Sequence, residues 1–202
     1  MFELVLATNN KGKIKEIKEI WKGMNIKFYT LEDFEGILPV EESGETFEEN
    51  AVKKATEVAR ITGKLTLADD SGLEVDVLNN EPGVKSSRYA DDNATDMENI
   101  IKLLDKMKDV PPERRGARFV CVVALADKDK VITTVNGSCE GVISKEPCGG
   151  SGFGYDPVFV RMDYGKTFAE LDLEVKNKIS HRARALEKIK LILERMIEKE
   201  KI

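Results

Sequence analysis

Two long β-prone segments, residues 117–126 and 130–143, follow each other with only a short Asp-Lys-Asp linker between them. A linker of this length joins neighbouring antiparallel strands, whereas parallel strands need a much longer crossover. The two segments are therefore predicted to pair with each other, and any fold proposed for the chain must contain this hairpin.

The N-terminal part of the chain has a different order of elements. A β-prone run at residues 2–8 precedes apolar residues at helical spacing over 11–21, and a second β-prone run follows at 26–30. Such an order of single strands and helices, combined with the adjacent strand pair later in the chain, favours a mixed α/β sheet over a purely parallel one. The fold class predicted from the sequence is therefore α/β.

Three further helices are predicted from local signals. The first begins after Thr46, which forms a capping-box pattern with Glu49, and it ends at Gly63. The others cover residues 94–107 and 180–199. Their predicted buried faces consist of Met97, Ile100, Ile101 and Leu104 in the former helix and of Ala185, Leu186, Ile189, Ile192, Leu193 and Met196 in the latter.

Length and charge limit the class of protein. A chain of 202 residues can bury a core without disulfides or a structural metal, as one domain or as two closely joined lobes. With 32 basic and 37 acidic residues, the net charge is -5, so a nucleic-acid duplex or an anionic membrane would meet little overall attraction. We therefore expect any phosphate recognition to be local, with neither a nucleic acid nor a membrane as a stable partner. The longest apolar run, residues 119–126, is far shorter than a bilayer span, which leads us to expect a cytoplasmic protein.

The few cysteines and the single histidine exclude several kinds of site. Cys121, Cys139 and Cys148 are far apart, odd in number and without a CxxC motif, which argues against a disulfide framework and against zinc. His181 is the only histidine, so a His-rich metal centre and a Ser-His-Asp triad elsewhere in the chain are excluded. The chemistry of this chain must depend on other groups.

The first candidate site lies at the first predicted turn from strand to helix. Backbone N–H groups and the positive end of a helix can hold phosphate at such a turn, and lysines add positive charge. The alternative is an Asn helix cap followed by lysines that face solvent. Neither the GxxxxGK[ST] P-loop nor the GxGxxG fingerprint is present. The residues of this turn are Thr8, Asn9, Asn10, Lys11, Gly12 and Lys13.

The second candidate is a pair of adjacent acids, Asp69 and Asp70, which follows an apolar run and is itself followed by Ser71 and Gly72. We expect these four residues to interrupt a strand over residues 65–78. Two carboxylates in a half-buried setting repel each other, and a divalent cation such as Mg²⁺ would relieve that repulsion. The alternative is an Asp-Asp-Ser-Gly turn within a hairpin.

Two features near the predicted helix at 46–63 could complete such a site. An acidic stretch that contains Glu41, Glu42 and Glu45 could supply one further metal ligand, and the sequence does not distinguish among the three. Acids before a helix also stabilise its N-terminus without any metal. Lys54 could reach a phosphate, although most lysines on such a helix face water.

Two later segments could recognise a nucleobase. The glycine-rich run at residues 149–157 would let the backbone approach a ligand and leave an aromatic ring free to stack. The run KNKISHR at 176–182 brings basic and hydrogen-bonding groups to the start of the last helix. The alternatives are a flexible loop for the first run, and a helix cap or a packing histidine for the second.

These segments, taken together and in order, resemble those of the inosine triphosphate pyrophosphatase family. The resemblance extends from Thr8 to Leu186 and covers nearly the whole chain. The six motifs that carry it are TNNKGK, ETFEENAVKKA, LADDSGL, PGVKSSRYA, GGSGFGYDPVF and KNKISHRARAL.

The resemblance implies a single nucleoside triphosphate pyrophosphatase domain over residues 1–202, without an independent linker. Its fold would be α/β, with two lobes around a long mixed β-sheet flanked by helices, an active site in the central cleft, and a homodimer as the usual assembly. The implied reaction converts a nucleoside triphosphate and water into the monophosphate and pyrophosphate with Mg²⁺. The implied substrates are ITP, dITP and XTP, whose removal keeps hypoxanthine and xanthine out of DNA and RNA.

The resemblance also assigns residues to the metal and the phosphates. Asp70 would bind metal and activate water, Glu42 would be a second metal ligand, and Asp69 would support them as a third. Ser71 would touch the substrate, and Lys54 would contact a phosphate. The turn at residues 8–13 would grip the triphosphate.

The base would be bound by the two later segments. Phe153 would stack on the purine, and Gly154, Tyr155 and Asp156 would shape the pocket around it. The groups implied to read the oxygen at purine position 6 are Lys176, His181 and Arg182.

Three other functions fit parts of the same pattern. A related pyrophosphatase that acts on modified pyrimidine nucleotides would share the metal and phosphate chemistry but have another base pocket. A nucleotide sensor or RNA-binding module could retain the site without turnover. Hydrolysis at the terminal phosphate would give the diphosphate and orthophosphate instead of pyrophosphate.

Overall fold

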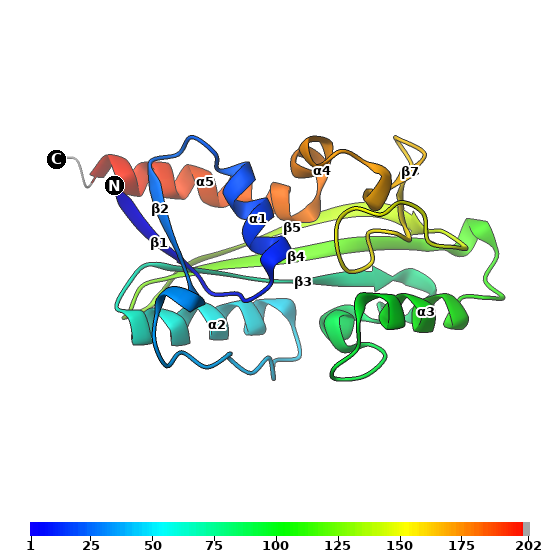
Figure 1. Ribbon diagram of the computed structural model, residues 1–202, viewed down its shortest axis with the longest axis horizontal. Helices are drawn as coiled ribbons and strands as arrows, with labels where there is room; N and C mark the ends of the chain where they lie inside the picture. Colours follow the sequence, from blue (N-terminus) through cyan, green and yellow to red (C-terminus); the bar gives the residue numbers. More distant parts are fainter. Residues whose placement is uncertain (200–202) are drawn as a thin grey trace. The chain divides into compact units, whose positions relative to one another are not determined.

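The fold of this protein, described for residues 1–199 by a computed structural model, is built on one mixed sheet of seven strands (Figure 1). The strand order is β2-β1-β3-β4-β5-β6-β7. β1 pairs in parallel with β2 and β3, whereas β6 pairs antiparallel with β5 and β7. The predicted α/β class with a mixed sheet is confirmed. The strands are β1 (Phe2–Leu6), β2 (Ile26–Thr30), β3 (Thr66–Val75), β4 (Gly116–Ala126), β5 (Val131–Ile143), β6 (Phe159–Arg161) and β7 (Lys166–Thr167).

The helices connect these strands and flank them. They are α1 (Lys11–Ile20), α2 (Phe47–Thr62), α3 (Asp96–Lys106), α4 (Leu173–Ile179) and α5 (His181–Lys199). Short 3-10 segments, among them η1 (Leu31–Asp33) and η3 (Gly83–Arg88), occupy several of the loops. Among residues 1–199, no helix combines the length and the apolar character that a bilayer span requires.

Contacts divide the chain into two compact units. Unit 1 consists of Met1–Asp70, Cys121–Gly137 and the chain from Arg182 onward, and unit 2 consists of Ser71–Val120 and Ser138–His181. β3, β4 and β5 each contribute residues to both units. The predicted site residues are therefore distributed over two units.

In unit 1, the alternation of side chains along the strands makes two separate cores. Leu4 and Leu6 of β1 pack with α1 and α5, whereas Val5 and Ala7 pack with α2. Figure 1 shows the same arrangement, with α1 and α5 on one side of β1 and α2 on the other. Because successive strand residues point to opposite faces, neighbouring residues of β3 must also serve different faces.

The core of unit 2 lies around α3 and the aromatic side chains of Phe119, Phe159 and Phe168. The Phe119 and Phe159 ring centroids are 4.5 Å apart, and the Phe119 and Phe168 rings are stacked at 5.9 Å. Aromatic packing of this kind contributes beyond the area that it buries. Tyr155 of the glycine-rich run belongs to the same core.

The start and end of α2 agree with the predicted signals. The Thr46 hydroxyl accepts a hydrogen bond from the Glu49 N–H at 3.1 Å, and the Glu49 carboxylate accepts one from the Thr46 N–H at 3.2 Å. Gly63 ends the helix at φ 66°, a left-handed conformation that favours glycine. The capping box and the glycine stop are therefore both confirmed.

Replacing Thr46 with Ala is expected to lower the free energy of unfolding by about 1 kcal/mol, because the Glu49 N–H loses its acceptor. Urea denaturation followed by circular dichroism would measure the change. Thr56→Ala on the same helix is a matched control, since the Thr56 hydroxyl donates only to the Val52 and Lys53 carbonyls of its own helix. Equal losses in the two variants would contradict the capping argument.

Two predictions about secondary structure are wrong. The strand expected to be interrupted at Asp69-Asp70-Ser71-Gly72 runs without a break from Thr66 to Val75. In α3 the buried side includes Ile100, Leu103 and the C-cap Met107, whereas Met97 and Ile101 of the predicted face are 50% and 60% exposed. The sequence analysis also missed β7 and α4, which are both short.

Candidate active site

The turn between β1 and α1 is held by its own side chains. Asn10 is the N-cap of α1 and accepts a hydrogen bond from the Lys13 N–H at 3.1 Å. The Thr8 hydroxyl accepts one from the Asn10 N–H at 3.2 Å. The Asn cap considered as the alternative reading is therefore present, and it fixes a helix N-terminus at which an anion is favoured.

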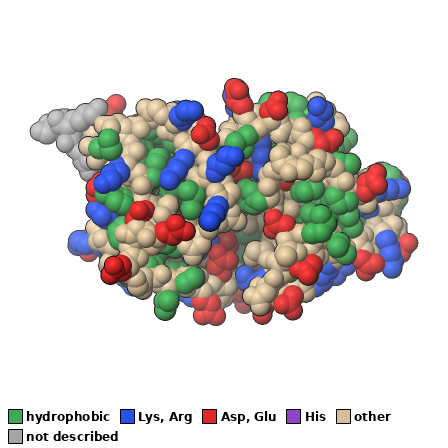
Figure 2. Space-filling view, viewed as in Figure 1, with side chains coloured by type: hydrophobic (Ala, Val, Ile, Leu, Met, Phe, Trp, Pro, Cys, Tyr) green, Lys and Arg blue, Asp and Glu red, His purple; other side chains and the backbone are tan. Residues whose placement is uncertain are grey.

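A cavity of about 630 Å³ adjoins this turn in unit 1. Thr8, Asn9 and Lys11 line it, together with Lys15 and Lys18 from the next turns of α1. Figure 2 shows basic side chains over the α1 region of this face, beside acidic ones. The turn thus brings the predicted Thr8, Asn9 and Lys11 to one solvent-accessible hollow.

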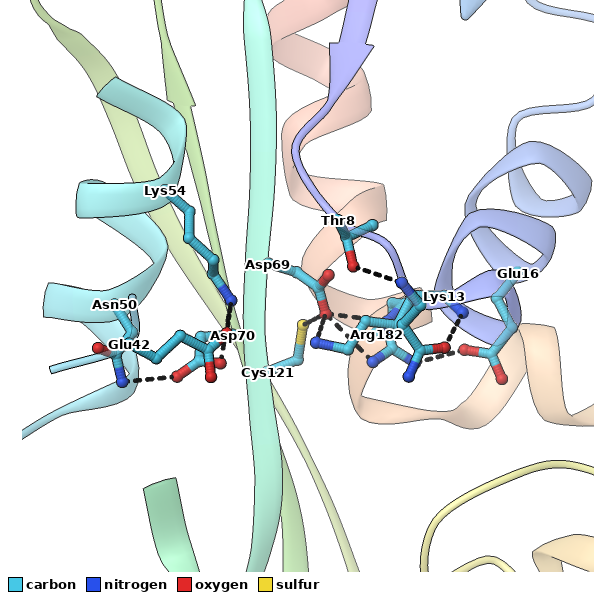
Figure 3. Close-up of polar contacts among 11 residues, drawn as sticks. Thr8, Lys13, Glu16, Glu42, Asn50, Lys54, Asp69, Asp70, Cys121 and Arg182 are labelled. Carbon is cyan, nitrogen blue, oxygen red and sulfur yellow. Dashed lines mark hydrogen bonds and ion pairs between the residues drawn. The ribbon is translucent and has the colours of Figure 1, made fainter. Parts of the chain in front are cut away.

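Lys13 points from the turn toward the sheet and ends in a buried group of charges (Figure 3). Its ammonium lies 3.1 Å from Asp69 Oδ2. The Arg182 guanidinium donates to the same oxygen at 3.2 and 3.1 Å, and its third nitrogen pairs with Glu16. Two acids and two bases are thereby joined in one network; Asp69 and Arg182 are each 1% exposed and Glu16 is 3% exposed.

The charge of Asp69 is stabilised by these partners. Burial by itself would raise the pKa of the Asp69 carboxyl, but the positive charges of Lys13 and Arg182 outweigh it and hold that pKa below its ordinary value. Asp69 is therefore ionised at neutral pH and acts as a fixed acceptor for Lys13.

Asp70 lies on the opposite face of β3 and belongs to a second group. Lys54 of α2 contacts Asp70 Oδ1 at 3.2 Å and Glu42 Oε1 at 2.5 Å. The Asn50 amide donates to Asp70 Oδ2 at 3.1 Å. Figure 3 shows these side chains on one side of the strand and the Asp69 network on the other. We call Glu42, Asn50, Lys54 and Asp70 the carboxylate cluster.

The electrostatics of the carboxylate cluster differ from those of the Asp69 network. Burial raises the pKa of Asp70 despite the nearby Lys54, and the negative charge of Glu42 adds to the rise. For Lys54, burial alone would lower the pKa, but the charges of Asp70 and Glu42 raise it instead. The cluster carries two carboxylates and one ammonium, so it could accept additional positive charge.

The predicted metal ligands are therefore only partly brought together. Glu42 and Asp70 direct oxygens at the same point, and Glu42 is the member of the Glu41, Glu42 and Glu45 set that contacts Lys54. Asp69 does not join them, since consecutive strand residues face opposite ways. Within residues 1–199, no group of three or more His, Cys, Asp or Glu side chains is arranged to hold a metal ion. The expected repulsion between Asp69 and Asp70 is relieved by separate protein cations.

In unit 2, the glycine-rich loop brings acidic, basic and aromatic side chains into contact. The Asp156 carboxylate accepts a hydrogen bond from the Phe153 N–H at 2.9 Å and pairs with the Lys176 ammonium at 2.5 Å. That ammonium also lies 4.8 Å from the centroid of the Phe153 ring. A Cβ on Gly152, at φ 82°, would come within 2.1 Å of Asp156 Oδ2. Glycine at this position is therefore needed for the loop to close on Asp156.

Further contacts anchor this loop to the rest of unit 2. The Gly154 N–H donates to Asp96 Oδ2 of α3 at 2.7 Å, and the Tyr155 hydroxyl donates to the Ser86 carbonyl at 2.9 Å. His181, at the start of α5, stacks on Phe119 with ring centroids 4.6 Å apart and is 4% exposed. Of the predicted base-binding residues in unit 2, Phe153, Asp156 and Lys176 are in mutual contact, and His181 packs on an aromatic side chain.

Arg182 belongs to the buried network in unit 1, where its donors meet Asp69 and Glu16. These contacts give it a structural role, and they do not support its predicted role in reading the base. Ser71 follows Asp70 on β3 and is half-buried.

The sequence analysis missed four residues of these groups: Glu16, Asn50, Asp96 and Cys121, whose thiol lies 3.9 Å from Asp69 Oδ2. A signal existed for two of them. Asn50 is one helical turn before Lys54 on the inner face of α2, and Glu16 follows Lys13 by one turn on α1. Polar residues on an inner helix face must have buried partners. No comparable signal indicates Asp96 or Cys121.

The thiols near the site are expected to differ strongly in reactivity. Burial, aided by the charge of Asp69, raises the pKa of the Cys121 thiol to about 12. Cys139 is also buried, whereas Cys148 is half-exposed. At pH 8, iodoacetamide should therefore label Cys148 in the folded protein and label all three residues in urea. Peptide mass spectrometry measures this, and rapid labelling of Cys121 in the folded protein would contradict the burial described here.

Comparison with known proteins shows the family of this chain and agrees with its fold. The sequence model of the Ham1 family matches residues 4–192. The dITP/XTP pyrophosphatase of Desulforamulus reducens is 52% identical over 96% of both chains, and that of Bacillus subtilis is 46% identical over 96% of this chain and 98% of the other. A HAM1 protein structure from Coxiella burnetii superposes with a TM-score of 0.87 at 44% identity, covering 96% of this chain and 100% of the other.

A second solved structure gives the same result. The Ham1 protein of Staphylococcus aureus superposes with a TM-score of 0.84 at 41% identity, covering 95% of this chain and 98% of the other. The fold is that of an α/β protein whose unit 1 contains both a capped turn from strand to helix and a cluster of paired carboxylates. This chain belongs to the Ham1 family.

Proposed function

We propose that this protein is a Mg²⁺-dependent hydrolase that converts ITP, dITP and XTP into the nucleoside monophosphate and pyrophosphate. This reaction would keep deaminated purines out of DNA and RNA. The observation that carries the proposal is the carboxylate cluster, in which Asp70 and Glu42 direct oxygens at one cationic atom. The name dITP/XTP pyrophosphatase, given to relatives about half identical over nearly the full length, supports the reaction and the substrates.

The donor set of the cluster fits a hard divalent cation. Mg²⁺ in phosphoryl-transfer sites is bound by one or two carboxylates, by waters and by the substrate phosphates. Asp70 and Glu42 would provide the carboxylates, and Asp69 would remain outside this set. When bound there, Mg²⁺ would supply neutralisation of phosphate charge and a lowered pKa of bound water.

The residues of the turn, of the Asp69 network and of the carboxylate cluster, together with Ser71, then have distinct tasks. Asp70 accepts the proton of the water that attacks the α-phosphorus, a role for which a carboxylate with a raised pKa is suited. The N–H groups of the turn at residues 8–13 and the ammonium of Lys13 hold the phosphates. Lys54 makes a further phosphate contact, and Ser71 touches the substrate. Asp69 orients Lys13 through their 3.1 Å ion pair.

Recognition of the base is assigned to unit 2. Phe153 stacks on the purine, and Gly154, Tyr155 and Asp156 shape its surroundings. Lys176 and His181 supply donors toward a 6-oxo group. The 6-amino group of adenine would face these donors with its own donors, at a cost of about 1 to 3 kcal/mol.

We further propose that the chain acts as a single catalytic domain, as a homodimer in the cytoplasm. The buried free thiols Cys121 and Cys139 fit a reducing compartment. Size-exclusion chromatography with light scattering tests the assembly, and a monomer at micromolar concentration would refute the dimer.

A substrate panel tests the function. Purified protein with Mg²⁺ is expected to release pyrophosphate from ITP, dITP and XTP far faster than from GTP or ATP. Preference for a methylated pyrimidine triphosphate would reassign the base pocket. Binding of dITP without any release of pyrophosphate would instead favour a nucleotide sensor.

A further inference from the structure

The ammonium of Lys54 occupies the point where the oxygens of Asp70 and Glu42 converge. It lies 3.2 Å from Asp70 Oδ1 and 2.5 Å from Glu42 Oε1, and the whole residue is 7% exposed. The other oxygen of Asp70 accepts the hydrogen bond from Asn50 at 3.1 Å. Both oxygens of Asp70 are therefore already engaged by protein donors.

Any cation that binds Asp70 and Glu42 must share their oxygens with the Lys54 ammonium. A divalent ion that takes the Asp70 Oδ1 and Glu42 Oε1 positions would meet the Lys54 ammonium at close range, and like charges repel strongly where water is scarce. The Lys54 side chain has a flexible stem, so its head can move while α2 stays in place. Lys54 and the cation therefore compete for the same carboxylate oxygens.

We propose that Lys54 is a resident counter-ion of the carboxylate cluster, which stabilises Asp70 and Glu42 in the metal-free protein and is displaced from them when Mg²⁺ binds. The displaced ammonium is then available to the phosphates of the substrate. This inference rests on the proposed function in one respect, namely that Asp70 and Glu42 form the Mg²⁺ site.

Calorimetric titration of Mg²⁺ into the substrate-free protein tests the competition directly. Lys54→Met removes the ammonium but keeps an apolar stem, and the Kd for Mg²⁺ is expected to fall by about tenfold or more. Lys53→Met is the matched control, because it removes the same charge from the adjacent position and Lys53 contacts the Ser43 hydroxyl at 3.0 Å. Its Kd should stay within about twofold of the wild-type value.

A second readout separates this role from a purely structural one. In Lys54→Met, the KM for dITP should rise while the Kd for Mg²⁺ falls, because the ammonium repels the metal and attracts the phosphates. If Lys54 only maintained the shape of the site, its replacement would weaken the binding of dITP and the binding of Mg²⁺ alike. If Lys54→Met does not fold, Lys54→Gln serves the same comparison.

The outcomes separate this inference from the proposed function. If Asp70→Asn abolishes Mg²⁺ binding but both Lys54 variants bind Mg²⁺ as the wild type does or more weakly, the counter-ion role is refuted and the metal site stands. If Asp70→Asn leaves Mg²⁺ binding unchanged, the metal site itself is refuted, and the counter-ion role with it.

Discussion

Replacing Asp70 with Asn is expected to reduce pyrophosphate release from dITP by about a hundredfold to ten-thousandfold, the contribution usual for a positioned general base. Asn has nearly the same shape and can still contact Asn50 and Lys54, but it cannot accept the proton of the attacking water. Steady-state kinetics with saturating Mg²⁺ would measure the loss as a fall in kcat.

The same variant should fold normally. Burial raises the pKa of Asp70, so the fold disfavours its charged form, and a neutral Asn removes that penalty. The melting temperature of Asp70→Asn is therefore expected to equal or exceed that of the wild type in the absence of metal. Activity within about threefold of the wild type in a well-folded variant would contradict the role assigned to Asp70.

Replacing Arg182 with Met is expected to lower the free energy of unfolding by about 3 to 5 kcal/mol. The guanidinium is 1% exposed and is the shared partner of Asp69 and Glu16, so its loss leaves two buried carboxylates without the cation that joins them. Removing one partner from a buried ion group costs far more than the group contributes as a whole, because the uncompensated charges stay buried.

Arg184→Met is the matched control for this variant, since Arg184 is exposed two residues further along α5. Its expected effect lies within about 0.5 kcal/mol. Urea denaturation monitored by circular dichroism compares the two variants. A loss of less than about 1 kcal/mol for Arg182→Met would show that the Asp69 network is not a major source of stability.

Local signals in the sequence were sufficient for the elements whose stability is local. The Thr46–Glu49 capping box and Gly63 mark the two ends of α2, and the alternating apolar residues of β1 and β2 indicate their strands. These signals concern contacts between residues close in the chain. Their effect on local structure does not depend on the tertiary fold.

The unbroken β3 strand could not be predicted in the same way. Two adjacent acids argue against a buried strand only while their partners are unknown, and those partners are distant in sequence. Arg182, which binds Asp69, is 113 positions away, and Lys54, which binds Asp70, is 16 positions away. Tertiary cations on both faces of the sheet therefore override the local expectation of a turn.

The face of α3 shows a second limit. The apolar residues of this helix extend around more of its circumference than the core covers, so its periodicity allows more than one buried stripe. Ile100 belongs to both the predicted and the observed face, but Leu103 and Met107 are buried and Met97 and Ile101 are not. Only the position of the aromatic core of unit 2 determines which of the two possible faces of α3 is buried.

For the site, motif resemblance indicated candidate residues but did not give their grouping. It placed Asp69 with Asp70 as metal ligands, whereas strand alternation separates them, and it placed Arg182 at the base, whereas Arg182 lies in the Asp69 network. The sequence indicates which residues could take part in a site, but not which of them contact each other. The pairing of Asn50 with Asp70 and of Glu16 with Arg182 required the fold.

Hydrolysis of dITP in ¹⁸O-labelled water, with products resolved by mass spectrometry, tests the central claim most directly. We predict dIMP and pyrophosphate as the products, with ¹⁸O in dIMP because water attacks the α-phosphorus, and no turnover when EDTA replaces Mg²⁺. Formation of dIDP and ¹⁸O-labelled orthophosphate would contradict the claim, since the bond broken would then be the terminal one.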